Sequence, residues 1–402
     1  MKAVRQLDLP AGSPICAPGV QKLLSVLNVD GLNARMVGGC VRDLLLQRKI
    51  IDIDLACSLP PEETMLRLKR AKIKVVPTGL KHGTITAVLD KVGYEVTTLR
   101  HDVETDGRHA TVAFTDDWIG DAARRDFTFN ALYLDADGSL YDPCGGLADL
   151  ETRRVRFIGA ADERIREDAL RILRFFRFAA QIGDGLMDPQ GFDACIRYKD
   201  LIDNLSGERL AQELLKILAA QNLLSVIAVM AKHDFLSHIL GVTPDWPRFR
   251  RYVQQEQNLG RCDRLARLCS LLRRGEGAGA QVSRHLRLSN RQTKYLVAYD
   301  RHDLNISPGM ADKTLRRAIY LHGRDVVAFA LLDGNSEASP TTQLSELLRL
   351  IDTWPVPSFP VQGRDLIQAG YAAGPALGDL LKQREADWIA SDFTLKKQDL
   401  LQ

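Results

Sequence analysis

Two aspartates separated by one residue, Asp52 and Asp54, are the side chains in this chain best suited to catalysis. They lie in the segment IIDIDLA, where they alternate with apolar residues as expected for a β-strand. Side chains two apart on a strand point to the same face, so both carboxylates should face one way while Ile51, Ile53 and Leu55 face a core. Two like charges at this spacing repel each other unless a cation lies between them. Because divalent metals such as Mg²⁺ prefer hard oxygen ligands, the segment predicts a metal site.

A pair of glycines, Gly38 and Gly39, precedes these aspartates. They follow an apolar run that ends at Val37, and the sequence predicts a helix that starts near Val41. Since glycine has no Cβ, backbone N–H groups can approach a phosphate closely, and the N-terminus of a helix favours anions. Arg42 would add a fixed positive charge one turn into that helix. A tight turn without a ligand is the alternative, but the aspartates downstream favour a phosphate site.

The segment DAARRDFTFNALYL contains two adjacent arginines, Arg124 and Arg125, followed by Asp126 and then by Asn130. Adjacent guanidinium groups suit the oxygens of a triphosphate. Asp126 is predicted either to accept a hydrogen bond from a ribose hydroxyl or to hold an arginine in place. The alternative is a purely structural Arg–Asp pair at the start of a strand.

Charged residues recur at steps of three in REDALRILRFFRF, namely Asp168, Arg171, Arg174 and Arg177. On one helix, Asp168 and Arg171 would be neighbours on the same face. Cytosine and adenine each carry an exocyclic amino donor beside a ring-nitrogen acceptor, which a carboxylate and a guanidinium match. Uracil and guanine present the opposite pattern and would leave both protein groups mispaired. In this interpretation Arg174 and Arg177 contact phosphates or adjust the position of the Asp168–Arg171 pair. The alternative is that Asp168 and Arg171 form an ordinary surface ion pair.

The elements that would position these residues begin with a part of mixed character, residues 20–157. Two β-like runs, ITAVLDKV and YEVTTLRHDV, lie on either side of Gly93 and predict a hairpin or adjacent strands. A second hairpin is predicted from FTFNALYLD and SLYDP, which flank the turn at residues 136–138.

From about residue 158 onward the apolar spacing becomes helical. Ser206 is a predicted N-cap, and WPVPSFP at 354–360 is a predicted non-helical connector. At 402 residues the chain is long enough for two to four units. We therefore predict an α+β fold with a mixed head and an all-α remainder. The predicted boundaries are 20–157 for the head, 158–240 for a helical neck, and 241–402 for a helical body and tail.

The composition, with 45% hydrophobic and 26% charged residues, is that of an ordinary globular protein. No run of about 18 apolar residues is present, so no membrane span is predicted. The seven cysteines form no C-x-x-C pair, which makes zinc and a disulfide framework unexpected and fits a reducing cytosol. The N-terminus has neither the apolar stretch of a secretory signal nor an Arg- and Ser-rich presequence. A cytoplasmic location is therefore predicted, with a mitochondrial one left open.

Positive charge is concentrated in one region although the whole chain carries only +3. Residues 248–294 contain twelve Lys and Arg against three acids, a net charge of +9, which leaves −6 for the rest of the chain. A polyanion such as RNA would be attracted to this region. Solvated helix faces are the alternative.

Taken together and in this order, the motifs resemble those of the class II nucleotidyltransferases, the family of CCA-adding tRNA nucleotidyltransferases and poly(A) polymerases. The segments that carry the resemblance, over about residues 34–180, are GGCVRD, DID, TDGRHATVAFTDDW, RRDFTFNAL, YDPCGGLADL and EDALRILRFFRF. Weaker similarity continues in LSGERLAQELLKIL and in GRDLIQAGYAAGPALG. The resemblance implies a nucleotidyltransferase-type mixed β-sheet head with flanking helices, followed by an all-α neck, body and tail.

The resemblance also implies roles for individual residues. Asp52 and Asp54 would be catalytic and would hold two Mg²⁺ ions. Glu95 falls where some family members carry a third acidic residue, although a solvent-facing glutamate is the alternative. The residues implied to bind the nucleotide are Gly39, Arg42, Arg125, Asp168, Arg171, Arg174 and Arg177.

The activity implied is template-independent addition of C, C and A to the 3′ end of tRNA, with CTP and ATP as substrates. The terminal 3′-hydroxyl would attack the α-phosphate and pyrophosphate would leave, with one metal lowering the hydroxyl's pKa and the other neutralising the leaving group. The basic region and the C-terminal helices would bind tRNA mostly through its phosphates. The sequence gives no indication of a required protein partner.

Three other activities stay open at this point. A poly(A) polymerase would share every head motif, and a partial enzyme would add only CC or only A. A non-catalytic RNA-binding protein with a degenerate head would keep the basic region but lose the aligned carboxylates. The segment TDGRHATVAFTDDW is similar to the flexible segment of CCA-adding members, which favours full CCA addition. The scattered His-Asp pairs lie in dissimilar contexts and predict no phosphohydrolase domain.

Overall fold

The computed structural model describes residues 1–402 except 32, 106–109, 184–185, 276 and 335–340, and gives the backbone alone for 102–105, 110–112 and 341. The chain divides into two compact units, Met1–Ile239 and Leu240–Gln402. The predicted head and almost all of the predicted neck fall in the first unit. The predicted body and tail fall in the second.

The first unit is built on a mixed eight-stranded sheet with the order β1-β10-β9-β2-β3-β6-β5-β4. All neighbouring pairs are antiparallel except β3 and β6, which run parallel. Strands β7 and β8 form a separate antiparallel pair. The strand bounds are β1 Arg5–Gln6, β2 Ala34–Val37, β3 Asp54–Cys57, β4 Lys74–Gly79, β5 Thr84–Leu89, β6 Val92–Thr98, β7 Arg100–Thr105, β8 Ala110–Phe114, β9 Tyr133–Leu134 and β10 Ser139–Tyr141.

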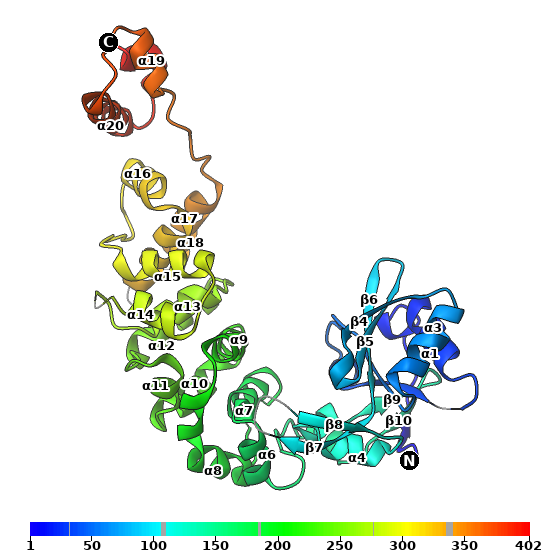
Figure 1. Cartoon of the computed structure of the whole chain (residues 1–402). Helices are drawn as coiled ribbons and strands as arrows, with labels where there is room; N and C mark the ends of the chain where they lie inside the picture. The colour runs from blue at the N-terminus through cyan, green and yellow to red at the C-terminus, as the bar shows by residue number, and fades with distance from the viewer. Residues whose placement is uncertain (32, 106–109, 184–185, 276, 335–340) are drawn as a thin grey trace. The chain divides into compact units, whose positions relative to one another are not determined.

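Helices accompany this sheet and then replace it along the first unit (Figure 1). The sheet is accompanied by α1 Pro18–Leu27, α2 Gly39–Leu45, α3 Pro61–Arg70, α4 Trp118–Ala123 and α5 Gly146–Glu151, with short 3₁₀ turns at η1 Pro14–Cys16, η2 Leu80–His82 and η3 Thr128–Asn130. The helical part continues through α6 Ala161–Glu167, α7 Leu170–Gln181, α8 Pro189–Arg197, η4 Lys199–Asn204, α9 Gly207–Leu218, α10 Leu223–Lys232 and α11 Phe235–Leu240. The predicted α+β class, with strands first and helices after, is confirmed.

Among its described residues, the second unit contains helices and connecting segments but no strand. Its helices are α12 Trp246–Asn258, α13 Arg264–Ser270, α14 Ala278–His285, α15 Asn290–Arg301, α16 Asp312–His322, α17 Arg324–Gly334, α18 Thr341–Thr353, α19 Gly363–Gln368, α20 Pro375–Ala390 and α21 Lys397–Leu400. Residues 355–360, all of them described, form neither helix nor strand, as predicted for the proline-rich connector. Within the described part of the chain we find no helix with both the length and the apolar character needed to cross a membrane.

Both predicted hairpins form, with two differences in detail. Strands β5 and β6 pair antiparallel, but their turn is Asp90-Lys91, where both φ angles are positive at 48° and 67°, and Gly93 lies inside β6. Two central residues with positive φ give the turn twist that suits a two-residue hairpin. Strands β9 and β10 also pair antiparallel, but the residues before them form the turn η3 instead of a longer strand.

The strand that carries the two aspartates is shorter than the sequence predicted. Strand β3 begins at Asp54, so Asp52 precedes it. Ile53 and Leu55 are buried as expected, but Ile51 is 81% exposed and the prediction that it faces a core is wrong. The alternation of a strand holds only where pairing with β2 and β6 fixes the backbone, and that pairing does not extend back to Ile51.

Candidate active site

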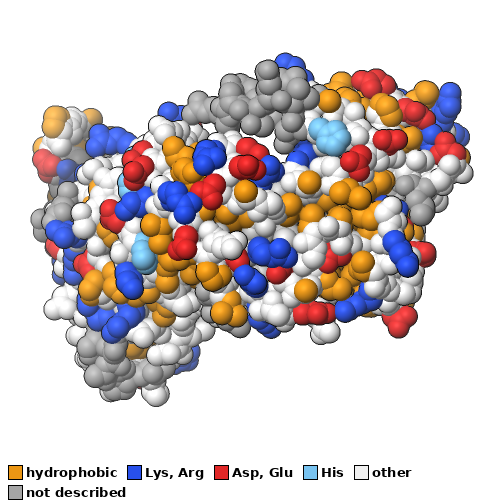
Figure 2. All heavy atoms as spheres, turned by 90° about the horizontal axis from the view of Figure 1, so that it is seen from below, with side chains coloured by type: hydrophobic (Ala, Val, Ile, Leu, Met, Phe, Trp, Pro, Cys, Tyr) orange, Lys and Arg blue, Asp and Glu red, His pale blue; other side chains and the backbone are white. Residues whose placement is uncertain are grey.

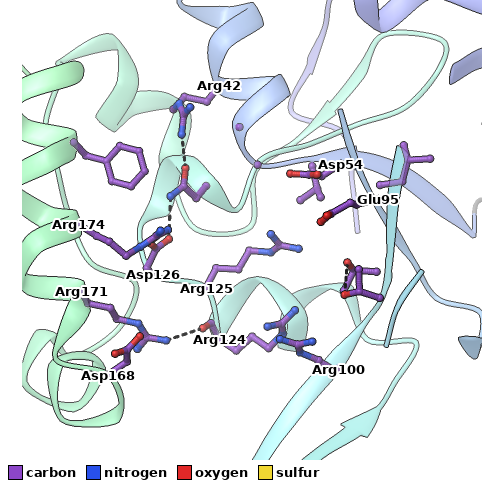
Figure 3. A pocket seen from close by; sticks show the side chains of 18 of the residues that line it. Arg42, Asp54, Glu95, Arg100, Arg124, Arg125, Asp126, Asp168, Arg171 and Arg174 are labelled. Carbon is purple, nitrogen blue, oxygen red and sulfur yellow. Dashed lines mark hydrogen bonds and ion pairs between the residues drawn. The ribbon is translucent and has the colours of Figure 1, made fainter. Parts of the chain in front are cut away.

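A cavity of about 490 Å³ in the first unit is lined by residues from all four of the sequence segments singled out for catalysis (Figure 3). Strands β3, β5 and β6 contribute to its wall, as do the turn before α2, the end of α4, η3 and helix α7. The lining residues are Val37, Gly38, Gly39, Arg42, Asp54, Leu55, Thr84, Glu95, Thr97, Arg100, Arg124, Arg125, Asp126, Asn130, Asp168, Arg171, Arg174, Arg177 and Phe178.

Asp54 and Glu95 are adjacent carboxylates on this wall. They are register partners on the parallel strands β3 and β6, and Figure 3 shows their side chains directed toward the same space. Asp52 is not part of the cavity wall, yet its charge acts on Asp54. Within the part of the chain that the structure describes, no hydrogen bond or ion pair reaches the carboxylates of these three residues. Because these three carboxylates have no such partner among the described residues, their negative charge is not compensated by a hydrogen-bonded or ion-paired cation.

This uncompensated charge affects the pKa of Asp54. Partial desolvation, then the nearby charges of Glu95 and Asp52, raise the pKa of Asp54 above its ordinary value of 3.8, while Arg125 acts against them. Among the described residues, no three His, Cys, Asp or Glu side chains form a metal cage by themselves. Mg²⁺ binds through one or two carboxylates and completes its shell with water and substrate phosphates. The donor set around Asp54 and Glu95 therefore fits such an ion.

The raised pKa of Asp54 predicts a dependence of stability on pH and metal. Between 3.8 and the raised pKa the folded protein binds protons more tightly than the unfolded chain, so stability falls as pH rises through this window. We expect the Asp54→Asn variant to unfold at a higher temperature than the wild type at neutral pH in EDTA, with the difference shrinking toward pH 4. Added Mg²⁺ should raise the melting temperature of the wild type more than that of the variant. Equal responses of both proteins to Mg²⁺, measured by calorimetry, would contradict a metal site at Asp54.

The two glycines form the turn between β2 and α2. Gly38 has a φ of 72°, a conformation that side chains with a Cβ rarely adopt, whereas Gly39 is the first residue of α2, two residues earlier than predicted. A Cβ built on Gly38 would lie 3.9 Å from Nη1 of Arg125, and one built on Gly39 would lie 3.7 Å from Nη2 of Arg42. Two guanidinium groups thus converge on this turn.

Arg42 and Arg125 are each fixed by a carboxylate. Arg42 donates from Nε and Nη2 to Asp43 at 2.9 and 3.0 Å, and from Nη1 to Asn130 Oδ1 at 3.0 Å. Arg125 donates to Asp121 Oδ2 from Nε at 3.2 Å and from Nη2 at 2.9 Å. These bonds hold the two cations at the cavity wall in set orientations.

Asp121, on α4, is the acid that organises the adjacent arginines. Its buried carboxylate also accepts from Arg124 Nε at 2.8 Å and from the Tyr133 hydroxyl at 2.9 Å. Burial alone would raise the pKa of Asp121, but Arg125 and Arg124 outweigh it and hold the pKa below its usual range. Structural Arg–Asp pairs therefore exist here, as the alternative interpretation held, but with Asp121 and at the end of a helix. Sequence reasoning missed Asp121, although its spacing of three and four from the arginines is a usable signal.

Asp126 holds an arginine, which was one of its two predicted roles. Its carboxylate accepts from Arg174 Nε at 2.6 Å and from Asn130 Nδ2 at 2.9 Å. Because Asn130 also accepts from Arg42, a continuous chain of hydrogen bonds runs from Arg42 through Asn130 and Asp126 to Arg174 (Figure 3). The glycine turn beside α2 is thus linked to helix α7 across the cavity.

Asp168 and Arg171 line the same cavity, but they are not on one helix and do not pair with each other. Asp168 has extended backbone, with φ −155° and ψ 103°, and ends α6 before α7 begins at Leu170. Its carboxylate accepts from Arg209, whereas Arg171 donates to Glu167 at 2.6 Å. The prediction of one continuous helix across these residues is wrong, because the chain breaks at Asp168 and Ala169 to join two short helices.

Arg177 is the most buried of the predicted arginines, with 8% exposure. Nη1 donates to Glu213 Oε1 at 3.2 Å, and the guanidinium lies 4.2 Å from the ring centre of Phe178. Burial lowers the pKa of Arg177 to about 10, against the opposing charge of Glu213. Sequence reasoning missed Glu213 and Arg209, both in the segment LSGERLAQELLKIL, because their partners are more than 30 residues away.

The predicted basic region is less uniform than its net charge implies. Arg248 forms a buried ion pair with Asp333 at 2.7 Å, and the buried Arg267 pairs with Glu256, so these two cations are internal. The exposed cations of the region are Arg250, Arg251, Arg264, Arg273, Arg274, Arg284, Arg287, Arg291 and Lys294. On the face of the molecule drawn in Figure 2, Lys and Arg side chains are interspersed with acidic and hydrophobic ones.

The structure describes one predicted segment only in part. Residues 106–109 of TDGRHATVAFTDDW lie outside the described residues, so its likeness to a flexible family segment stays a prediction.

Comparison with known proteins places this chain in a family. Residues 34–156 match the family model "Poly A polymerase head domain", and residues 187–247 match "Probable RNA and SrmB- binding site of polymerase A". The human protein named CCA tRNA nucleotidyltransferase 1, mitochondrial, is 32% identical over 98% of this chain and 92% of its own length. A Geobacillus thermodenitrificans CCA-adding enzyme is 37% identical over 63% of this chain and 64% of its own.

The fold of the chain is also similar to that of this family. The crystal structure of Bacillus stearothermophilus CCA-adding enzyme in complex with CTP superposes with a TM-score of 0.77 at 27% identity, covering 96% of each chain. Identity across nearly the whole length, a matching head-domain model and a matching fold agree with the motif order. This chain therefore belongs to the family of CCA tRNA nucleotidyltransferases and poly(A) polymerases.

Proposed function

We propose that this protein adds C, C and A to the 3′ end of tRNA without a nucleic-acid template, using CTP and ATP and releasing pyrophosphate. The observation that carries the proposal is that one cavity brings together Asp54 and Glu95, which have no hydrogen-bonding partner among the described residues, two convergent arginines, and the wall formed by Asp168 and Arg171. The names of its relatives, CCA tRNA nucleotidyltransferase and CCA-adding enzyme, support the same activity.

Each side of the cavity takes one part of the reaction. Arg42 and Arg125, fixed by their carboxylate partners, bind the nucleotide phosphates beside the glycine turn. Asp168 and Arg171 bind the base, so that the α-phosphate is held beside the carboxylates, where the tRNA 3′-hydroxyl attacks it. Positioning and charge neutralisation are sufficient for phosphoryl-type transfer, and no covalent enzyme intermediate is needed.

Asp54 and Asp52, with Glu95 as a third acid, are the proposed ligands of the divalent metal. When bound, Mg²⁺ would assist deprotonation of the attacking hydroxyl and neutralise charge on the leaving pyrophosphate. The sequence alone left open whether Glu95 is a third acid of the site or a solvent-facing glutamate. Its position beside Asp54 in register and in the cavity wall supports the first role.

The tRNA itself is proposed to contact the exposed cations of residues 248–294. Arg284, Arg287, Arg291 and Lys294 lie on or between helices α14 and α15, which pack against each other in the second unit. Exposed arginines and lysines contribute most of their binding energy through RNA phosphates. A cytoplasmic location stays a prediction, since relatives with this length of similarity carry mitochondrial names.

A substitution at the glycine turn separates nucleotide binding from folding. In Gly39→Ala the added methyl would meet only Arg42 at 3.7 Å, and alanine favours a helix more than glycine, so stability should stay within about 1 kcal/mol of the wild type. If the phosphates approach this backbone, the methyl group displaces them and the KM for both CTP and ATP should rise about tenfold or more. The matched control is Gly378→Ala in α20, where nothing lies within 4 Å. An unchanged KM in Gly39→Ala would contradict the proposed phosphate site.

The function is tested on tRNA that lacks its CCA terminus. The protein is incubated with Mg²⁺ and CTP, ATP or both, and the 3′ ends are sequenced. Ends extended by CCA with both nucleotides, by CC with CTP alone and by nothing with ATP alone are expected. A homopolymer with ATP would indicate a poly(A) polymerase, a product limited to CC or to A would indicate a partial enzyme, and binding without extension would indicate a non-catalytic protein.

A further inference from the structure

Helix α9 contacts two of the residues that line the base-binding side of the cavity. Nη2 of Arg209 donates to both carboxylate oxygens of Asp168, at 3.0 and 2.8 Å. One turn later on the same helix, Glu213 accepts a hydrogen bond from Arg177 at Oε1, 3.2 Å from Nη1, and forms an ion pair with it. Since α7 and α9 pack against each other, the backbone of α9 is a rigid support for these two contacts.

Asp168 needs such a support because its own backbone gives it little. It lies in the extended break between α6 and α7, and the local contact to its carboxylate is the Leu170 amide, 3.1 Å from Oδ1. Arg209 supplies the long-range contact, from 41 residues further along the chain. Both side chains are partly accessible, at 34% for Arg209 and 28% for Asp168, so this pair lies at the margin of the cavity.

The pair leaves Asp168 able to bind a nucleotide base. A carboxylate offers about four lone-pair positions, and Arg209 and Leu170 occupy three of them at most. Asp168 is part of the cavity wall, whereas Arg209 is not among the described residues that line it. Arg209 therefore acts on Asp168 from outside the cavity and leaves acceptor capacity directed into it.

We infer that Arg209 is a positioning residue for base choice, an inference that rests on the proposed function. A carboxylate held in place and paired with a guanidinium is an acceptor only, which suits the amino group of cytosine or adenine. Without Arg209, the carboxylate of Asp168 can rotate and no longer presents an acceptor in a fixed position. The repulsion between this carboxylate and the carbonyl oxygen of uracil, which disfavours UTP, should then become weaker. The residue thus controls selectivity without contacting the nucleotide.

The test compares kcat/KM for CTP and UTP on the same tRNA substrate in Arg209→Gln, Arg209→Lys and the wild type. In Arg209→Gln the ratio of kcat/KM for CTP to that for UTP should fall about tenfold or more, since the charged contact is lost. Arg209→Lys keeps the charge and should restore part of the ratio. The matched control is Arg197→Gln, which removes an Arg–Asp pair between α8 and α6 away from the cavity.

A structural role alone would lower activity with both nucleotides, or the melting temperature, without changing this ratio. A ratio in Arg209→Gln equal to that of the wild type or of Arg197→Gln would overturn the inference. Should Arg209→Gln fail to fold, an unchanged ratio in the folded Arg209→Lys would overturn it, because lysine cannot reproduce the contact of Nη2 with both oxygens. Wild-type protein that does not extend tRNA at all would instead overturn the proposed function, and this inference with it.

Discussion

Asp54→Asn is expected to lower the single-turnover rate of CMP incorporation by about a thousandfold, a loss of about 4 kcal/mol of transition-state stabilisation. The substitution keeps the size of the side chain but removes the charge that a divalent ion requires. Because Asp54 lacks a hydrogen-bonding partner among the described residues and its pKa is raised by partial desolvation, Glu95 and Asp52, the charge is unfavourable for folding alone. The variant should therefore fold at least as well as the wild type while losing its activity.

The control for this prediction is Asp90→Asn. Asp90 is an exposed acid in the turn between β5 and β6, and asparagine tolerates its φ of 48°. This variant removes the same charge from the same sheet without altering the cavity and should keep the wild-type rate. Asp54→Asn with a rate within threefold of Asp90→Asn would show that Asp54 has no catalytic role.

Asp168→Asn is expected to change the choice of nucleotide more than the rate with the best one. The amide keeps one acceptor oxygen but adds an NH₂ donor, which can pair with the carbonyl oxygen of uracil. The wild-type site would discriminate against UTP because Asp168 has no hydrogen-bond donor for the carbonyl oxygen of uracil. Asparagine provides that donor, so this discrimination should be lost. We expect the ratio of kcat/KM for CTP to that for UTP to fall about a hundredfold, measured on tRNA lacking its terminus.

The matched control here is Asp162→Asn on α6, which removes a carboxylate paired with Arg197 outside the cavity wall. It should leave the CTP to UTP ratio unchanged. If Asp168→Asn gives the same ratio as Asp162→Asn, the base is recognised elsewhere in the cavity.

Local pattern was sufficient to predict most of the elements around the cavity. The apolar run before Gly38, the two hairpins and the helical spacing beyond residue 158 each depend on residues a few positions apart, although the turn of the first hairpin is Asp90-Lys91 and not Gly93. The same is true of the strand at Asp54, although its start was misplaced, so that the exposed Ile51 was assigned to a core. Periodicity gives the direction of side chains but not the residue at which strand pairing begins.

The contacts that hold the site residues were largely beyond a single sequence. The break at Asp168 interrupts a run whose charges recur at steps of three, and the partner of Asp168 is Arg209, on another helix. The net charge of residues 248–294 likewise did not reveal that Arg248 and Arg267 form buried ion pairs. Such pairings are set by tertiary packing, which spacing along the chain does not encode.

The central claim is that one cavity separates chemistry from base choice, with Asp54 serving the first and Asp168 the second. Single-turnover incorporation of CTP, ATP, UTP and GTP by the wild type, Asp54→Asn and Asp168→Asn tests it most directly. We predict that Asp54→Asn slows all four nucleotides by one common factor and leaves their ratios unchanged, whereas Asp168→Asn narrows the gap between C or A and U or G. A change of ratios in Asp54→Asn together with a uniform loss in Asp168→Asn would contradict the account.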